Sequence, residues 1–218
     1  MKQIITKDKS ITFYDETTKE TYHSITGAEE EATEKHAKAL KIWEKNNPII
    51  YDCFFGLGYN SAASIDQIRK HKNQTKIKIY CFENDKKILK KILKIKTTFE
   101  SYCIIQNFIK NFLEKRKTTY KEKDITLIMF FGDIKQQLYK PRQNADYVFW
   151  DPFSPKKQPK TWTTEIFKDI KQHMNTNSKL STYSYAKKTR QNLKETGFSI
   201  KDGPKIGRKT PSLIAEIK

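Results

Sequence analysis

Apolar residues come in short runs that alternate with helical patterns along the chain. Runs at residues 49–55, 77–82, 125–131, 147–150 and 179–183 are nearly free of charge and are long enough for buried strands. Buried strands that alternate with helices are typical of a mostly parallel sheet covered on both faces. The pattern therefore predicts an α/β fold.

Four stretches between and around these strands have helical patterns. We predict helices at residues 28–43, 86–96, 164–173 and 186–196. In the first of them the acidic residues come early and the lysines late, as the helix dipole prefers. A further helix is expected directly after the turn that follows the strand at 49–55.

The two ends of the chain differ from this alternation. Residues 11–14 and 21–24 are short extended pieces around a polar turn and predict a small hairpin. Near the other end, residues 198–200 and 212–217 flank a loop rich in Gly, Pro and Lys. Two strands joined in this way predict an antiparallel C-terminal hairpin that closes the sheet.

The length of 218 residues suits one hydrophobic core with an appended segment. We therefore predict an N-terminal extension at residues 1–30 and a Rossmann-like domain at residues 31–218. The longest apolar runs are far shorter than the ~20 residues that a membrane-spanning helix needs. The N-terminus also lacks the apolar stretch of a signal peptide. We expect a cytoplasmic protein with no membrane partner.

A net charge of +18 favours a polyanionic partner, because lysines and arginines that neutralise phosphates release counterions. A genome rich in A and T also enriches lysine, so the composition alone leaves both explanations open. Charge therefore adds weight to a nucleic-acid partner without establishing one.

Neither the cysteines nor the histidines have the spacing of metal ligands. The cysteines lie in apolar segments, where reduced core thiols are expected; they are Cys53, Cys81 and Cys103. The histidines are interpreted as structural; they are His23, His36, His71 and His173. We predict no metal site.

Ligands of an open α/β sheet bind beyond the carboxyl ends of its strands. The first strand runs into Gly56 and Gly58, which permit a tight turn and a close approach of the backbone to a ligand. Glu83 ends the second strand, where a carboxylate can accept hydrogen bonds from ribose hydroxyls. Ser61 stands where a dinucleotide fingerprint would have its third glycine, which argues against NAD.

Three further residues extend this interpretation. Gly132 and Asp133 end another strand, where the carboxylate can accept a hydrogen bond from the amine of adenine. Asp52 precedes the glycine turn, as in many methyltransferases. Together these features favour S-adenosylmethionine as the cofactor.

The segment Asp151-Pro152-Phe153 follows a third strand and brings together a carboxylate, a constrained backbone and an aromatic ring. Asp151 could aim the lone pair of an acceptor amine or remove its proton, and Phe153 could stack on a base. A proline-rich turn whose Asp caps backbone N–H groups is the simpler alternative.

Basic residues are expected at the same end of the sheet. Lys156, Arg208 and Lys209 could there contact a phosphate backbone, although any single lysine could equally belong to a solvated surface.

Eight stretches resemble the methyltransferase domain of MnmC, which completes the methylaminomethyl group on the wobble uridine of certain tRNAs. They are residues 22–24, 27–28, 31–32, 52–60, 146–162, 182–184, 197–198 and 207–209. The stretch at 146–162 is similar to the family signature Asp-Gly-Phe-(Ala/Ser)-Pro-x-x-Asn-Pro-x-x-Trp. It departs from that signature with Pro152 in place of Gly and Gln158 in place of Asn.

The resemblance implies a class I methyltransferase that acts on the aminomethyl-uridine of a tRNA anticodon loop. It implies Asp151 as the catalytic residue and the Pro152–Phe153 pair as part of the amine site. The cofactor-binding residues that it implies are Tyr22, Ser24, Gly56, Gly58, Asn60, Glu83, Gly132 and Asp133. Fused members carry an FAD-dependent oxidase after this domain, so we expect the oxidase or other aminomethyl-forming enzymes to act separately here.

Three alternatives remain open at this stage. One is a methyltransferase for another nucleic-acid amine, since Asp-Pro-aromatic segments also occur in enzymes that flip a nucleobase. Another is a non-catalytic RNA-binding module that has kept the fold. A third is a protein that reaches RNA only through a partner.

Overall fold

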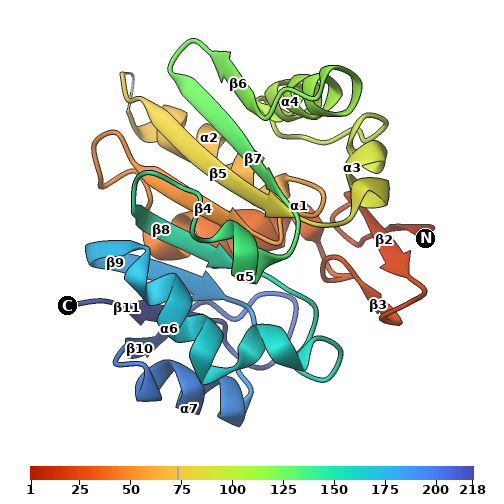
Figure 1. Ribbon diagram of the computed structural model, residues 1–218. Helices are drawn as coiled ribbons and strands as arrows, with labels where there is room; N and C mark the ends of the chain where they lie inside the picture. The colour runs from red at the N-terminus through yellow and green to blue at the C-terminus, as the bar shows by residue number, and fades with distance from the viewer. Residues whose placement is uncertain (73) are drawn as a thin grey trace.

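The computed structural model describes residues 1–72 and 74–218. Its centre is a twisted sheet of eight strands in the order β10-β11-β9-β8-β4-β5-β7-β6 (Figure 1). The parallel strands are β4 (Ile49–Cys53), β5 (Ile77–Glu83), β7 (Ile125–Phe131), β8 (Ala145–Trp150) and β9 (Met174–Thr182). The antiparallel strands are β6 (Thr119–Glu122), β10 (Ser199–Asp202) and β11 (Leu213–Glu216).

This architecture confirms the predicted α/β fold with its mostly parallel sheet. All five buried runs form parallel strands, and the two C-terminal pieces form an antiparallel hairpin that joins the sheet through β11. Strands β4 and β8 are neighbours although a long segment of chain separates them. The order of the sheet therefore reverses between them, which is where an open α/β sheet binds its ligands.

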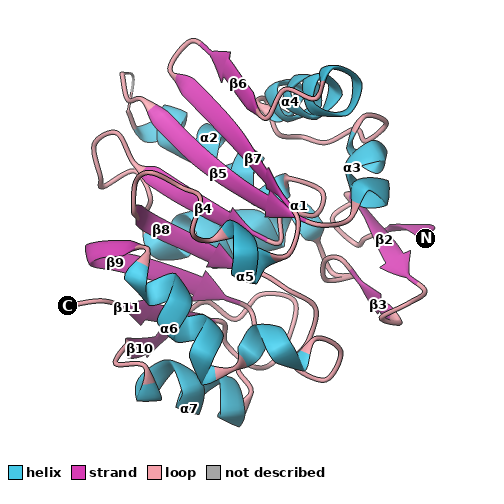
Figure 2. Cartoon of the chain, viewed as in Figure 1, coloured by secondary structure: helices cyan, strands magenta, loops and turns pink. Residues whose placement is uncertain are grey.

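Helices cover both faces of the sheet (Figure 2). They are α2 (Tyr59–His71), α3 (Lys86–Ile92), α4 (Tyr102–Lys115), α5 (Ile134–Gln137), α6 (Thr164–Gln172) and α7 (Lys187–Glu195), with a 3₁₀ turn at Pro159–Trp162. Successive residues of a strand point to opposite faces. Ile50 accordingly packs in the cluster with α2 and α4, whereas Tyr51 packs in the cluster with α6.

The segment predicted as one helix at residues 28–43 differs from that prediction, because it is not a continuous α-helix. It consists of a short α1 (Ala28–Glu31), a π-helical segment (Ala32–Lys38) and a turn that ends it at Lys41, whose φ is 51°. The wider π turn is continued by the bond from the N–H of Ile42 to the carbonyl of Ala37, five residues back. Hydrophobic periodicity cannot reveal such an inserted residue.

A second, antiparallel sheet lies at the N-terminal end of the chain. Its strands are β1 (Lys2–Ile5), β2 (Ile11–Asp15) and β3 (Glu20–Thr21), and Figure 1 shows it beside the carboxyl ends of the central strands. Phe13 of β2 packs into the same hydrophobic cluster as the central sheet. The division of the chain at residue 30 stays a prediction.

Two other expectations concern thiols and membranes. Cys53 and Cys81 are buried as predicted, but Cys103 is exposed because it lies on the outer face of the amphipathic helix α4. Across residues 1–72 and 74–218, no helix combines the length and the apolar character needed to cross a membrane.

Candidate active site

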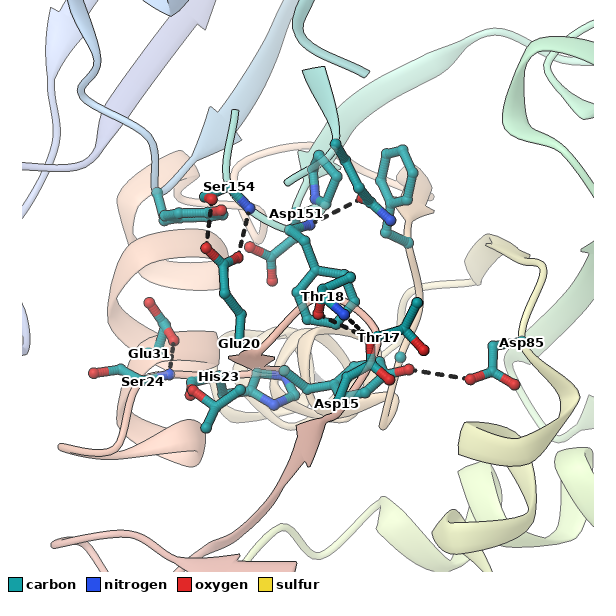
Figure 3. Close-up of a pocket in the computed structure, with 18 of the residues that line it drawn as sticks. Asp15, Thr17, Thr18, Glu20, His23, Ser24, Glu31, Asp85, Asp151 and Ser154 are labelled. Carbon is teal, nitrogen blue, oxygen red and sulfur yellow. Dashed lines mark hydrogen bonds between the residues drawn. The ribbon is translucent and has the colours of Figure 1, made fainter. Parts of the chain in front are cut away.

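A cavity of about 650 Å³ opens where β4, β5 and β8 end, beneath the N-terminal sheet (Figure 3). Six separate stretches of the described chain line it: residues 15–31, 54–56, 83–85, 151–158, 183 and 207–208. Among the residues predicted for the site, the lining includes Tyr22, Ser24, Gly56, Glu83, Asp151, Pro152, Phe153 and Arg208. The predicted residues that lie outside the lining are Gly58, Asn60, Gly132, Asp133, Lys156 and Lys209.

The glycine turn after β4 has the backbone conformation that its sequence predicts. Gly56 and Gly58 have φ of 55° and 72°, a region that glycine adopts without strain. A Cβ on Gly56 would approach the ring of Tyr22 at 3.4 Å, and one on Gly58 would lie 2.7 Å from the ring of Phe55. Gly56 therefore borders the cavity, whereas Gly58 permits close packing behind it and begins α2.

Glu83 closes the turn from the neighbouring strand. Its Oε2 accepts the N–H of Gly56 at 2.8 Å, and its Oε1 accepts the N–H groups of Asn84 and Asp85. Burial raises the pKa of Glu83, while these three backbone donors act in the opposite direction. A carboxylate has about four acceptor positions, so one stays open on the cavity side for a hydroxyl group.

Gly132 and Asp133 lie further along the same edge. The N–H of Gly132 donates to the carbonyl of Glu83, and Oδ1 of Asp133 accepts the N–H of Lys135 at 2.8 Å. Asp133 is exposed and caps α5. Its predicted contact with adenine stays a prediction, since the side chain already serves the start of this helix.

Asp151 projects from the end of β8 toward the cavity, and its side chain is 11% exposed. Asn60, in the first turn of α2, donates Nδ2 to Oδ2 of Asp151 at 3.1 Å. Burial, reinforced by the negative charge of Glu31, raises the pKa of Asp151 to about 6. The carboxyl group is thus poised to exchange a proton near neutral pH.

A second buried layer of polar residues lies behind Asp151. Glu31 accepts the ammonium group of Lys35 at 2.5 Å and the N–H of Ser24 at 2.8 Å. Burial alone would raise the pKa of Glu31, but the positive charge of Lys35 holds it below its usual value. Burial lowers the pKa of both His23 and His36, so these imidazoles are neutral at physiological pH.

The loop after Asp151 is held by side chains from several elements. The N–H of Phe153 donates to Oε1 of Gln158 at 3.1 Å, so glutamine braces the loop at the position where the MnmC signature has asparagine. Ser154 donates its N–H and its hydroxyl group to the carboxylate of Glu20, a contact that Figure 3 shows. The ring of Phe153 packs edge-on against Tyr22, with 4.9 Å between the ring centres.

Tyr22 spans the other side of the opening. Its hydroxyl group donates to Oδ2 of Asp85 at 3.2 Å, and its burial raises its pKa. With Glu20 bonded to Ser154, the N-terminal sheet is attached to the rims of both β5 and β8. Tyr22 thus lines the cavity, and its contact with a cofactor stays a prediction.

Arg208 is a basic residue in the lining of the cavity. Its guanidinium group lies 4.9 Å from the ring centre of Tyr183. Lys156 and Lys209 are exposed outside the cavity. Contacts of these cations with a phosphate backbone therefore stay predictions.

Most of the acidic residues that line this cavity were not predicted from the sequence. Six residues that line the cavity are acidic: Asp15, Glu20, Glu31, Glu83, Asp85 and Asp151. The acids of the N-terminal segment looked like ordinary polar and helix-start residues, and only a hairpin folded over the strand ends brings them here. An acidic cavity in a chain with a net charge of +18 suits a cationic ligand.

The residues present fit S-adenosylmethionine. Gly56 gives the close backbone approach, Glu83 keeps an acceptor position for a ribose hydroxyl, and the surrounding carboxylates match a positive sulfonium centre. The described residues contain no group of three or more His, Cys, Asp or Glu side chains arranged to hold a metal ion.

Comparisons with known proteins agree with this geometry. A model of a family described as S-adenosyl-L-methionine-dependent methyltransferase matches residues 94–218. An uncharacterized protein of Methanocaldococcus jannaschii, MJ0670, is 32% identical over 96% of this chain. The tRNA 5-methylaminomethyl-2-thiouridine biosynthesis bifunctional protein MnmC of Campylobacter hominis is 31% identical over 78% of it. The chain spans 58% of the first relative and 26% of the second.

Among solved structures, MNMC2 from Aquifex aeolicus matches 100% of this chain with a TM-score of 0.82 and 29% identity, and the match covers 70% of that protein. TrmN from Thermus thermophilus matches 83% of this chain and 47% of its own, with a TM-score of 0.52 and 11% identity, which supports the fold alone. The family match covers more than half of the residues. The residues at the ends of β4, β5 and β8 fit S-adenosylmethionine, the methyl donor that the family description names. The chain belongs to the S-adenosyl-L-methionine-dependent methyltransferases, as an MnmC-like domain.

Proposed function

We propose that this enzyme methylates the exocyclic amine of aminomethyl-uridine at the wobble position of tRNA, giving methylaminomethyl-uridine. The observation that carries the proposal is the buried carboxyl group of Asp151 beside an acidic cavity, with its pKa raised to about 6 by burial. An alkylammonium group is the cation that such a cavity accommodates, and it must lose a proton before its nitrogen can attack. The name of MnmC from Campylobacter hominis, a tRNA 5-methylaminomethyl-2-thiouridine biosynthesis protein, supports the choice of tRNA.

The chemistry divides between the cofactor and the protein. When bound, S-adenosylmethionine would supply the methyl group: its methyl C–S bond would break as the N–C bond forms, and the sulfonium would leave as a neutral thioether. Asp151 takes one proton from the ammonium group, so that the N–H bonding pair becomes the lone pair that forms the new N–C bond. Hydrogen bonding by the carboxyl group and packing by Phe153 orient the amine, and most of the acceleration comes from this near-attack geometry.

The remaining predicted residues have supporting roles in the proposal. Gly56 and Glu83 bind the nucleoside of the cofactor, with Gly58, Asn60, Gly132 and Asp133 shaping the loops around it. Tyr22 and Ser24 close over the cofactor.

On the substrate side, Pro152 fixes the backbone next to the amine. Lys156, Arg208 and Lys209 contact phosphates of the anticodon loop. We expect the reaction in the cytoplasm, with the aminomethyl group made beforehand by separate oxidase or aminomethyl-forming enzymes.

The test is methyl transfer from labelled S-adenosylmethionine to tRNA from cells that lack this modification, followed by identification of the product nucleoside. Wild type should yield methylaminomethyl-uridine, and Asp151→Asn should lose at least about 100-fold in rate while it still binds the cofactor in calorimetry. Asp124→Asn is the matched control, because Asp124 pairs with Arg69 immediately before β7, at the opposite end of the sheet.

Label in a different nucleoside would instead identify another nucleic-acid amine as the substrate. Cofactor binding without any methylation of tRNA would contradict the proposal.

A further inference from the structure

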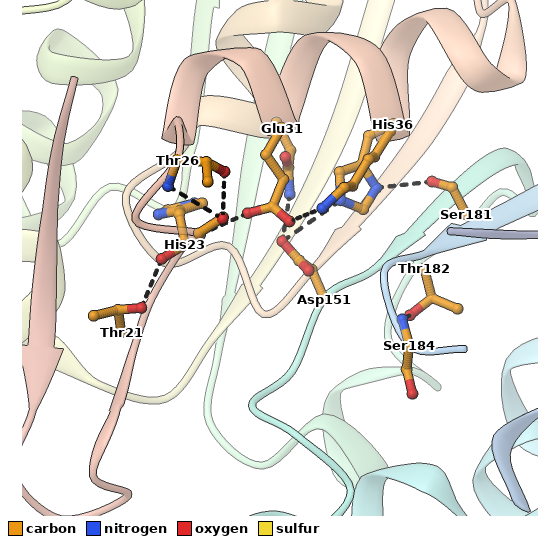
Figure 4. Close-up of polar contacts among 12 residues, drawn as sticks. Thr21, His23, Thr26, Glu31, His36, Asp151, Ser181, Thr182 and Ser184 are labelled. Atoms are coloured by element: carbon orange, nitrogen blue, oxygen red, sulfur yellow. Dashed lines mark hydrogen bonds and ion pairs between the residues drawn. The ribbon is translucent and has the colours of Figure 1, made fainter. Parts of the chain in front are cut away.

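His36 lies directly behind Asp151, on the side away from the cavity (Figure 4). Its Nδ1 is 2.8 Å from the hydroxyl oxygen of Ser181 in β9, and its Nε2 is 3.6 Å from Oδ2 of Asp151. The imidazole is completely buried and packs edge-on against Phe149. These contacts hold the ring in one plane, with Nε2 directed at the carboxyl group.

The protonation state of His36 follows from this environment. Burial lowers its pKa to about 4, so the ring is neutral and carries one N–H. With the hydrogen on Nδ1, the lone pair of Nε2 would face the negative Oδ2 of Asp151. The favoured tautomer therefore has its hydrogen on Nε2, and Ser181 donates its hydroxyl hydrogen to Nδ1.

Oδ2 of Asp151 is thus approached by two donors from inside the protein. Asn60 donates to it at 3.1 Å. Nε2 of His36 is buried without a hydrogen-bond partner among the described residues and lies 3.6 Å from the same oxygen. Across the same part of the chain, no hydrogen bond reaches Oδ1 of Asp151. Oδ2 faces the protein, and Oδ1 is left for the ligand in the cavity.

The π-helical segment explains why a histidine reaches this place. In an α-helix, residues 31 and 36 would point about 140° apart, because each residue turns by about 100°. The wider π turn, with partners five residues apart, places Glu31 and His36 on the same buried side. Such insertions occur frequently at functional sites.

We propose that His36 is a positioning residue for the methyl transfer: its Nε2–H holds Oδ2 of Asp151 so that Oδ1 receives the proton of the amine, and Ser181 fixes the required tautomer. This inference rests on the role proposed for Asp151. The separation of 3.6 Å shortens to a hydrogen bond when the substrate engages Oδ1, as hydrogen bonds of catalytic groups do in complexes.

Other titratable and polar groups also face Asp151, from several parts of the chain. The negative charge of Glu31 raises its pKa; the side chains of His23, Lys35 and Asn60 lower it. Asp52, in β4, is a further carboxyl group close enough to interact with it. All of these groups are unchanged in a variant of His36, so such a variant isolates the contribution of one donor.

Two variants of His36 separate its two contacts. Asn places a polar atom near the position of Nδ1, so His36→Asn keeps a partner for Ser181 and loses the donor to Asp151. Gln reaches the position of Nε2, so His36→Gln keeps that donor. The pKa of Asp151 is measured by carbon-detected NMR of the carboxyl group in the protein without ligands, with Asp151→Asn to assign the signal.

Loss of the donor should raise the pKa of Asp151 by about half a unit or more in His36→Asn, and His36→Gln should match wild type. The acid limb of the pH profile of kcat/KM for tRNA methylation should move by the same amount, which lowers kcat/KM about threefold or more at pH values below that limb. Ser181→Ala should shift the pKa in the same direction by less, and it serves in place of His36→Asn if that variant does not fold.

An equal pKa of Asp151 in wild type, His36→Asn and Ser181→Ala would overturn the proposal, even if activity were lost. Equal losses of kcat in the Asn and Gln variants with an unmoved acid limb would do the same. The NMR measurement needs no substrate, so a wild-type enzyme that failed to methylate tRNA would contradict the proposed function without affecting this test.

Discussion

Asn60 donates its side-chain Nδ2 to Oδ2 of Asp151 across 3.1 Å and thereby ties the first turn of α2 to the end of β8. The same turn follows the glycine loop, whose Gly56 is bonded to Glu83. Asp151 and the glycine turn are therefore braced against each other, so a displacement of one shifts the other.

The first prediction tests this contact. A hydrogen bond to the charged carboxylate lowers its pKa, so Asn60→Ala should raise the pKa of Asp151 further above its value of about 6. Methyl transfer should then fall about tenfold at pH 6 and much less at pH 8.5. The measurement is the pH profile of kcat/KM, with Asn111→Ala on exposed α4 as the control. A loss of equal size at both pH values would show that Asn60 acts only on structure.

The second prediction concerns stability against pH. Burial raises the pKa of Asp52 to about 7 and that of Asp151 to about 6. Both values lie above the usual 3.8, so the folded protein binds these protons more tightly than the unfolded chain. The associated stability is fully present below pH ~4 and is lost as the pH rises through 6 and 7. The Tm should therefore fall between pH 5 and pH 8.

Asp52→Asn isolates the larger shift, because Asn can still accept the hydroxyl hydrogen of Ser61, now bonded to Oδ2 of Asp52. We expect this variant to melt about 4 °C or more above wild type at pH 8 and close to wild type at pH 5. Calorimetry at both pH values gives the comparison. Melting curves of the variant that run parallel to wild type across this range would contradict the assignment to Asp52.

The third prediction compares two glycines with left-handed backbones. Gly58 and Gly197 have φ of 72° and 80°, so alanine costs backbone strain of about 1 kcal/mol at either position. A Cβ at Gly58 would also lie within 2.8 Å of side-chain carbons of Phe55 and Ile105, whereas at Gly197 it meets only the flexible end of Lys171. Gly58→Ala should thus be the more destabilising change by about 1–3 kcal/mol. Urea unfolding measures the difference, and equal midpoints would contradict it.

The fourth prediction addresses the attachment of the N-terminal sheet. Glu20 accepts two hydrogen bonds from Ser154, at 2.9 Å from the N–H and 2.5 Å from the hydroxyl group. Glu20→Gln and Ser154→Ala should each weaken the binding of S-adenosylmethionine about threefold to tenfold, because the cavity closes less often. The double variant should lose less than the product of the single effects. Independent effects in calorimetric titrations would exclude a shared contact.

Much of the fold followed from the sequence because its strands are continuous apolar runs that end on glycine or a carboxylate. The positions of Gly56, Glu83 and Asp151 at the strand ends could be anticipated for the same reason. The helix α4 and the edge strand β6 were not predicted, although both appear in the structure at Tyr102–Lys115 and Thr119–Glu122.

The polar layer behind Asp151 could not be predicted from the sequence, for a different reason. His36 was interpreted as a structural histidine, and Lys35 and Glu31 as parts of an ordinary charged helix. Their burial depends on one extra residue in a helical turn, a backbone event with no signature in hydrophobic periodicity. The contacts of Glu20 likewise depend on how a separate hairpin folds over the strand ends.

The three N-terminal strands form a ladder of their own and share none with the eight-stranded sheet in the described part of the chain. One wall of the cavity is thus made by a module whose backbone pairing is independent of the strands that carry Gly56, Glu83 and Asp151. Substitutions in these three strands can reshape the entrance of the cavity while the ends of β4, β5 and β8 stay unchanged. Selection could in this way alter which acceptor is admitted without rebuilding the reaction centre.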